Sequence, residues 1–405
     1  MASYIFEDRP PGRGEGMRVA LAAAAAIATL LLSVFVVNAQ PFETKARQAL
    51  MIDAETGTIL YSKNPDDPFP PASLAKLMTM EVVFRAVKEG RLKLEQTFPV
   101  SENAWRTGGA PSGTSTMFAA LKSSIQLSDL IQGVIVQAAN DGCIIIAEGM
   151  AGSEEKFAEL MTQRAREMGL QVSTFRNSSG LPADGQKVTA RELVWLATHI
   201  WREYPDFYRI YSQPDFTWNK ITQRNRNPLL KMNIGADGMG TGYTEESGYA
   251  IVASVERDGR RVFAAMSGLT SDRERAEEVR KMLDWGIDGF RKSQLFAVGE
   301  TVGQAKIYGG QKALVPLAAD EPVSIFMPTD SPDEVVAKIV YDGPVVAPIE
   351  QGQAIGALKV WVGKTLSQEI PLRATEAVPV GPIHWRAYDA VAELLTGWIR
   401  RARSS

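Results

Sequence analysis

Residues 70–79 read Pro-Pro-Ala-Ser-Leu-Ala-Lys-Leu-Met-Thr, and they place Ser73 three positions before Lys76. On a helix these two side chains share one face, so the amine can reach the hydroxyl. A serine hydroxyl is a poor nucleophile until an adjacent base activates it. The two prolines favour an extended approach, which predicts Ser73 at a helix start, where free backbone N–H groups favour anions. The same spacing occurs by chance on surface helices, so the rest of the chain must decide between the two interpretations.

The composition excludes several other classes of function. A chain of 405 residues with 45% hydrophobic residues is long enough for two domains with a sizeable core. A net charge of −3 argues against a nucleic-acid-binding protein. The single cysteine, Cys143, excludes an intramolecular disulfide, and neither His199 nor His384 stands in a recognisable nucleophile context. No Cys/His cluster has metal-ligand spacing, so we predict neither a metal nor a cofactor.

Residues 1–39 have the pattern of a signal peptide. Arginines precede an apolar run over 19–37, and Val37-Asn38-Ala39 resembles a signal-peptidase site. Either Met1 or Met17 could be the true start. The run is also nearly long enough to span a bilayer, so an uncleaved anchor is the alternative. Both interpretations predict that the remaining chain is exported.

The region from residue 40 to 291 has strand patterns at both ends and helix patterns between them. Strands are predicted at 49–53, 58–62, 249–255 and 261–266, and helices at 73–84, 154–168, 190–201 and 273–290, with a helix-rich apolar stretch at 128–150. This order predicts an α/β domain whose first and last strands meet in one sheet covered by helices.

The pattern changes after residue 291. Short β-rich runs at 313–317, 323–327, 335–340 and 358–362 are separated by Gly, Pro and Asp turns. They predict a small all-β sandwich domain over residues 292–378.

The last segment, 379–405, begins in a proline-bearing linker and continues as an amphipathic helix over 383–403. Trp385 and Trp398 fall near one stripe with basic flanks, which is typical of a helix lying on a membrane surface. The alternative is a helix packed on the sandwich or on a partner.

With these elements in place, the chain resembles the D-alanyl-D-alanine carboxypeptidases, the low-molecular-mass penicillin-binding proteins, from Gln40 to its C-terminus. The matches are the hairpin 51–57, residues 71–79 around Ser73, Gly108-Gly109-Ala110-Pro111-Ser112-Gly113, Asn140-Asp141-Gly142, Asn177-Ser178-Ser179-Gly180-Leu181-Pro182 and Gly238-Met239-Gly240-Thr241-Gly242-Tyr243-Thr244. Each motif is weak alone, and their shared order carries the resemblance.

The resemblance implies a β-lactamase/transpeptidase-like catalytic domain and acyl transfer on peptidoglycan stem peptides, with β-lactams as further ligands. It implies a location at the periplasmic face of the cytoplasmic membrane. The implied nucleophile, base and second-motif residue are Ser73, Lys76 and Asn140. The implied substrate-binding residues are Thr241, Gly242, Tyr243 and Arg275. The implied oxyanion hole is formed by the backbone N–H groups of Ser73 and Tyr243.

Two family motifs are altered in this chain. Where the family has Ser-x-Asn, this chain has Ala138-Ala139-Asn140, and where it has Lys-Thr-Gly, this chain has Gly240-Thr241-Gly242. A proton-relaying hydroxyl and a positive charge are therefore missing. Losing one catalytic hydrogen bond can cost ~10²–10³ in rate. A catalytically impaired penicillin- and peptidoglycan-binding protein is therefore the alternative function, and a β-lactamase is a third possibility.

Arg275 lies where the family has a basic residue close to the site. We expect it to take a larger share in recognising the substrate's terminal carboxylate, which a guanidinium can bind through two hydrogen bonds. The alternative is a helix charge paired with Asp272 or Glu278, each three residues away.

Overall fold

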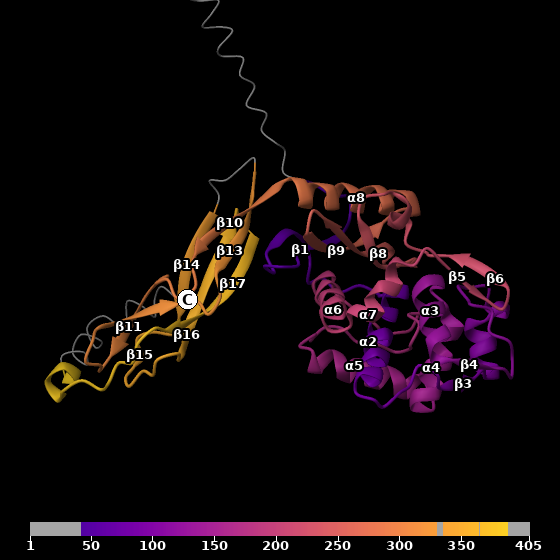
Figure 1. The fold of residues 1–405 in the computed structure, drawn as a ribbon, viewed down its shortest axis with the longest axis horizontal. Coiled ribbons are helices and arrows are strands. Elements are labelled where there is room, and N and C mark those ends of the chain that lie inside the picture. Colours follow the sequence, from indigo (N-terminus) through magenta and orange to yellow (C-terminus); the bar gives the residue numbers. More distant parts are fainter. Residues whose placement is uncertain (1–41, 330–334, 364, 388–405) are drawn as a thin grey trace, which may run out of the picture. The chain divides into compact units, whose positions relative to one another are not determined.

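The computed structural model describes residues 42–329, 335–363 and 365–387. They form an α/β domain followed by a β domain that begins near residue 290 (Figure 1). The predicted signal segment 1–39 and residues 388–405 of the predicted C-terminal helix lie outside the described residues; residues 383–387 are helical and exposed. No helix within the described ranges is long and apolar enough to cross a membrane.

The α/β domain is built on a five-stranded antiparallel sheet in the order β2-β1-β9-β8-β7. Its strands are β1 (Gln48–Asp53), β2 (Ile59–Lys63), β7 (Ala236–Thr244), β8 (Gly248–Arg257) and β9 (Arg260–Leu269). Leu50 of β1 lies opposite Ala265 of β9. The prediction that the first and last strands of the domain meet is therefore confirmed.

Both faces of this sheet are buried, because successive side chains on each strand alternate between two apolar clusters. On β1, Leu50 and Ile52 belong to the cluster that contains α2 (Lys76–Lys88) and α6 (Ala190–Glu203). Ala49 and Met51 belong to the opposite cluster, which contains α8 (Asp272–Asp288). This is the period of two that a strand imposes. Figure 1 shows α8 along one face of the sheet and α6 with α2 on the other.

The remaining helices lie in a long insertion between β2 and β7. They are α3 (Leu127–Gln137), α4 (Asn140–Ala151), α5 (Glu154–Glu167) and α7 (Pro205–Tyr208), with short turns η1 (Ala72–Ala75), η2 (Ala104–Gly108), η3 (Ala110–Ser112), η4 (Arg209–Ser212) and η5 (Pro228–Lys231). Two small hairpins, β3 (Thr97–Pro99) with β4 (Ser124–Gln126) and β5 (Asp215–Trp218) with β6 (Ile221–Arg224), complete the insertion.

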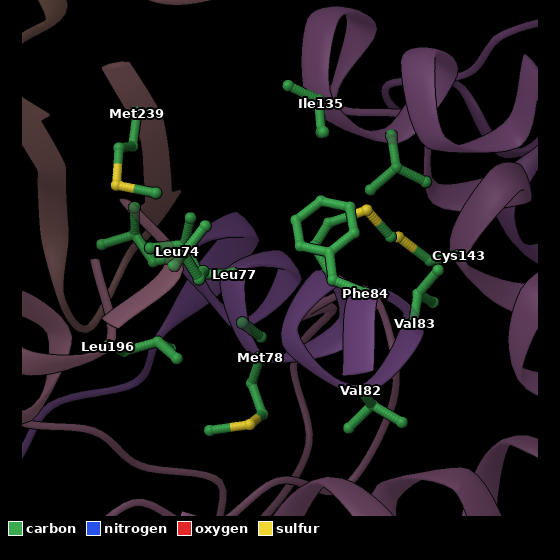
Figure 2. Close-up of a cluster of buried hydrophobic side chains, with 14 of the residues drawn as sticks. Leu74, Leu77, Met78, Val82, Val83, Phe84, Ile135, Cys143, Leu196 and Met239 are labelled. Atoms are coloured by element: carbon green, nitrogen blue, oxygen red, sulfur yellow. The ribbon is translucent and has the colours of Figure 1, made fainter. Parts of the chain in front are cut away.

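Helix α2 runs through the centre of this insertion. Ten of the thirteen residues of the helix are buried. Figure 2 shows its side chains, among them Leu77 and Phe84, in one cluster with Ile135 of α3, Cys143 of α4 and Leu196 of α6. The rigid core therefore fixes the helix that starts at Lys76.

The β domain contains two sheets, β10-β13 and β14-β16-β17-β12-β11-β15. Its strands are β10 (Phe290–Phe296), β11 (Gly303–Tyr308), β12 (Leu314–Ala318), β13 (Val323–Pro328), β14 (Val335–Tyr341), β15 (Val345–Val346), β16 (Ala354–Val362) and β17 (Thr365–Ala374). Ile325 of the first sheet shares one apolar cluster with Val315 and Val360 of the second. The predicted runs each fall on one of these strands, while β10, β11, β15 and β17 were not predicted.

Candidate active site

Ser73 and Lys76 are joined by a hydrogen bond at the point where η1 passes into α2. The Lys76 Nζ donates to Ser73 Oγ at 2.9 Å and to the backbone carbonyl of Ser179 at 2.6 Å. Ser73 was expected at the start of the helix, but it lies in the preceding 3-10 turn, and Lys76 is the first α-helical residue. The tighter turn still brings the two side chains together, because residues three apart nearly eclipse in a 3-10 helix.

Burial sets the chemistry of Lys76. The residue is 5% exposed. Desolvation lowers its pKa, while the negative forms of Cys143, Asp141 and Glu154 oppose the shift. A neutral amine can accept the proton of a serine hydroxyl, so the shift is in the direction that a general base requires.

The second motif lies where α3 ends and α4 begins. Ala138 between the two helices has a φ of 54°, a left-handed conformation that splits the predicted helix-rich stretch. Asn140 follows as the first residue of α4, and its Nδ2 donates to Thr114 Oγ1 at 3.0 Å. Its backbone N–H donates to the carbonyl of Ser115 at 2.8 Å. The buried Oδ1 of Asn140 has no hydrogen-bond partner among the described residues.

Asp141 holds this loop in place. Its carboxylate is fully buried and accepts hydrogen bonds from Thr116 Oγ1 at 2.6 Å and from the backbone N–H groups of Met117 and Ala119 at 3.0 Å. A buried carboxylate is tolerated when several donors surround it. The segment before β4 is thus tied to the start of α4, and Asn140 is positioned with it.

The third motif lies on β7, the sheet edge strand beside η1. A Cβ placed on Gly242 would be 3.0 Å from Ala72 Cβ and 3.1 Å from the carbonyl oxygen of Pro71, so only glycine fits comfortably between strand and turn. A Cβ on Gly240 would meet nothing within 4 Å. Tyr243 is 54% exposed, with its ring centroid 4.4 Å from that of Tyr249.

Three cavities meet at Ser73. The smallest, of about 30 Å³, is also lined by Lys76, Ala138 and Gly240. A second, of about 440 Å³, is lined by Asn140 and Tyr243, together with Ser73. The third, of about 690 Å³, is lined by Ser73, Ala138, Thr241, Gly242, Tyr243 and Arg275. The structure therefore brings all of the site residues predicted from the sequence to cavities that share one serine.

Arg275 is both paired and close to the cleft. It is 5% exposed, forms an ion pair with Asp272, and lies over the ring of Tyr249 at 5.6 Å. Burial lowers its pKa, and Asp272 and Tyr249 oppose the shift. Of the two interpretations made from the sequence, the ion pair with Asp272 is present, and Arg275 also lines the 690 Å³ cavity that contains Ser73.

Two residues of the site were not predicted from the sequence. Ser179 contributes its main-chain carbonyl to Lys76; the Asn177–Pro182 motif pointed to this loop but not to that contact. Arg226 lines all three cavities, and it stands between two asparagines in the loop after β6. The alternation Asn-Arg-Asn is the only sequence signal that could have indicated it.

Comparisons with known proteins agree with this geometry. A family model described as D-alanyl-D-alanine carboxypeptidase matches residues 35–270, and a model of the penicillin-binding protein 5 C-terminal domain matches residues 290–380. The D-alanyl-D-alanine carboxypeptidase DacC of Escherichia coli is 36% identical over 357 residues, which cover 87% of this chain and 89% of that protein. DacD of the same organism is 34% identical over 86% of this chain and 91% of that protein.

Solved structures show the same fold. Penicillin-binding protein 5 of Haemophilus influenzae has a TM-score of 0.70 and 33% identity, covering 84% of this chain and 99% of that one. Penicillin-binding protein D2 of Listeria monocytogenes in an ampicillin-bound form has a TM-score of 0.53 and 27% identity, over 62% of this chain and 100% of that one. With a family model over more than half of its residues and relatives matched along most of their length, this chain belongs to the D-alanyl-D-alanine carboxypeptidase family.

Proposed function

We propose that this protein removes the terminal D-alanine from peptidoglycan stem peptides through an acyl-enzyme on Ser73. The observation that carries the proposal is the 2.9 Å hydrogen bond between Lys76 Nζ and Ser73 Oγ in a solvent-connected cleft. A serine with an adjacent buried amine has the two parts that nucleophilic catalysis needs.

In the proposed reaction, neutral Lys76 takes the hydroxyl proton as Ser73 Oγ attacks the carbonyl carbon between the two D-alanines. The backbone N–H groups of Ser73 and Tyr243 stabilise the negative oxygen. The C–N bond then breaks, D-alanine leaves with the proton carried by Lys76, and water hydrolyses the ester on Ser73. Thr241 and Arg275 bind the terminal carboxylate, since both line the cavity on that side of the serine.

The two altered motifs favour a slower reaction. Without a serine at 138, the proton from Lys76 must reach the leaving nitrogen directly or through a water. The 30 Å³ cavity beside Ala138 and Gly240 exceeds the roughly 10–15 Å³ that a cavity needs, by the same measure, to hold one water. If the transfer fails, the protein remains a penicillin- and peptidoglycan-binding protein with little turnover, which is the second candidate function.

Intact-mass spectrometry separates these functions. The purified protein is mixed with benzylpenicillin and, separately, with a D-Ala-D-Ala peptide, and Ser73→Ala serves as the control. A covalent adduct that needs Ser73, together with released D-alanine, supports the carboxypeptidase. A slow adduct without D-alanine release supports the impaired binding protein. Fast recovery of free enzyme after penicillin supports a β-lactamase, and no adduct refutes the covalent mechanism.

We also propose that the protein acts at the periplasmic face of the cytoplasmic membrane. The support is the signal-peptide pattern of residues 1–39 and the amphipathic pattern of 383–403. At the described start of that helix, Ile383 is 80% exposed and Trp385 is 49% exposed. Co-sedimentation with anionic phospholipid vesicles should be lost when the chain is truncated after residue 378, and equal binding of both forms would refute the membrane role.

A further inference from the structure

Gly240 leaves a space near Ser73 unfilled, and it lacks the positive charge of the lysine that the family motif has at this position. A side chain added there would begin in open space, since nothing lies within 4 Å of its Cβ position. The substrate of the proposed reaction nevertheless ends in a carboxylate, which costs free energy to desolvate unless a charged donor meets it. Besides Arg275, which is buried and paired with Asp272, the site therefore needs a second cation that reaches the same cavity from another element.

The cationic side chains near Ser73 differ in how many hydrogen bonds and ion pairs they already form. The Lys76 amine is committed to Ser73 and Ser179. Arg275 is 5% exposed and paired with Asp272. Arg226 is exposed, and its guanidinium makes no hydrogen bond or ion pair with any residue in the described part of the chain.

Arg226 also borders more of the cavities around Ser73 than the other exposed cationic residues near it do. It lines all three cavities that meet at Ser73, including the small one beside Gly240 and Ala138. Arg224 and Lys231 line only the 690 Å³ cavity. Among these exposed cations, Arg226 alone is thus placed beside both the serine and the space left at position 240.

The backbone around Arg226 is fixed to both altered motifs. Its N–H donates to the carbonyl of Val136, two residues before Ala138, at 3.2 Å. The next residue, Asn227, is buried and donates from Nδ2 to the carbonyl of Gly238 at 2.8 Å, on the strand that carries Gly240. On the other side, buried Asn225 donates to the carbonyl of Tyr211 at 3.1 Å. The loop is anchored while the arginine side chain stays available.

We infer that Arg226 supplies the positive charge missing at position 240 and binds the substrate's terminal carboxylate together with Thr241 and Arg275, which line the same 690 Å³ cavity. The inference rests on the proposed function and goes beyond it by adding to Thr241 and Arg275 a carboxylate-binding loop residue outside the three family motifs. A guanidinium presents two parallel N–H donors to a carboxylate, and a lysine ammonium does not. The arginine is therefore a substrate-binding residue, and its effect depends on the ligand's charge.

The test compares acylation of Ser73 by benzylpenicillin, which carries a carboxylate beside its β-lactam ring, with acylation by its methyl ester. In Arg226→Ala we expect the second-order rate with the acid to fall about 10- to 100-fold, the range of a charged hydrogen bond, and the rate with the ester to change less than about threefold. Arg226→Lys should keep part of the rate. The double variant Arg226→Ala with Gly240→Lys should recover the acid rate, because position 240 has room for the side chain. Arg209→Ala, which removes an exposed arginine of η4 that lines none of these cavities, should change neither rate.

Equal losses for acid and ester, or no loss for either, would overturn the assignment. If neither compound acylates the wild-type protein, the proposed function fails, and equilibrium binding decides the inference separately. In that case a D-Ala-D-Ala peptide and its C-terminal amide are titrated into wild type and Arg226→Ala. A loss of affinity confined to the free acid supports the assignment, and equal affinities of the two proteins for the acid refute it.

Discussion

Replacing Gly180 by alanine should damage the turn that carries Ser73. Gly180 has a φ of +83°, and a Cβ at this position would be 1.7 Å from the carbonyl oxygen of Ala72 and 2.4 Å from its carbonyl carbon. These atoms belong to the backbone directly before Ser73 and cannot rotate away as a side chain would. The loop and the turn would have to separate by more than an ångström, which also threatens the Ser179 contact to Lys76.

The magnitude has two parts. Placing a non-glycine residue in the left-handed region costs about 1–2 kcal/mol, and forcing extra atoms into a packed site adds about 1–3 kcal/mol. We therefore expect Gly180→Ala to lower the free energy of unfolding by about 2–5 kcal/mol. Gly152→Ala is the matched control, since its φ is +81° and nothing lies within 4 Å of its Cβ position. Gly152→Ala should lose only the stability that corresponds to the left-handed backbone conformation, about 1–2 kcal/mol.

Urea denaturation gives the loss of stability for both variants, and the rate of covalent labelling by penicillin gives the effect on Ser73. A displacement of about 1 Å at a nucleophile can cost ~10² in rate, so labelling should fall by about that factor in Gly180→Ala and not in Gly152→Ala. If the two variants lose the same stability and label at the wild-type rate, the close packing of Gly180 on Ala72 does not position the serine.

Three further predictions concern buried groups. Burial lowers the pKa of Lys76, so acylation should accelerate as pH rises and reach its plateau below the usual pKa range of lysine. A rate that falls with rising pH would contradict a neutral lysine base. Lys76→Met should abolish labelling of Ser73. Asp141→Asn puts an amide against four donors, the fourth being the backbone N–H of Gly142, and should cost about 1–3 kcal/mol of stability. Thermal denaturation measures the loss, and an unchanged melting temperature would argue against the tie to Thr116. Burial raises the pKa of Cys143 to about 12, so the native protein should resist iodoacetamide at pH 8 while the urea-unfolded chain reacts; rapid native labelling would show that the thiol is accessible.

The sequence predicted the elements whose patterns are local. Short continuous apolar runs bounded by turn residues indicated β1, β8 and β9, which are buried on both faces. The apolar face of α5 indicated that helix, because burial on one side repeats with the period of the helix. The Ser73 and Lys76 pair could be predicted for the same reason, since three positions along the chain fix the distance between the side chains. The edge strand β7 has three glycines and little β propensity, so no apolar run indicated its full length.

The parts that sequence could not predict depend on packing between distant segments. The hydrogen bond from Lys76 to the Ser179 carbonyl joins residues 103 positions apart and uses a main-chain atom that every residue has. The left-handed Ala138 was also unexpected, because alanine favours a helix and the local preference is overridden by the turn between α3 and α4. Arg226 could not be separated from other surface arginines until the two flanking asparagines were seen to be buried.

The pairing of β1 with β9 has a consequence for how the chain folds. Leu50 pairs with Ala265, so the centre of the sheet cannot form until more than two hundred further residues have been synthesised. Contacts so distant in sequence slow folding, and the apolar β1 strand is exposed to wrong partners in the meantime. An early β1–β2 hairpin protects only one edge of that strand. The nascent chain therefore needs a chaperone, or rapid synthesis of the remaining residues, to keep β1 from pairing wrongly. Chains released before β9 is made should aggregate rather than form a smaller folded domain.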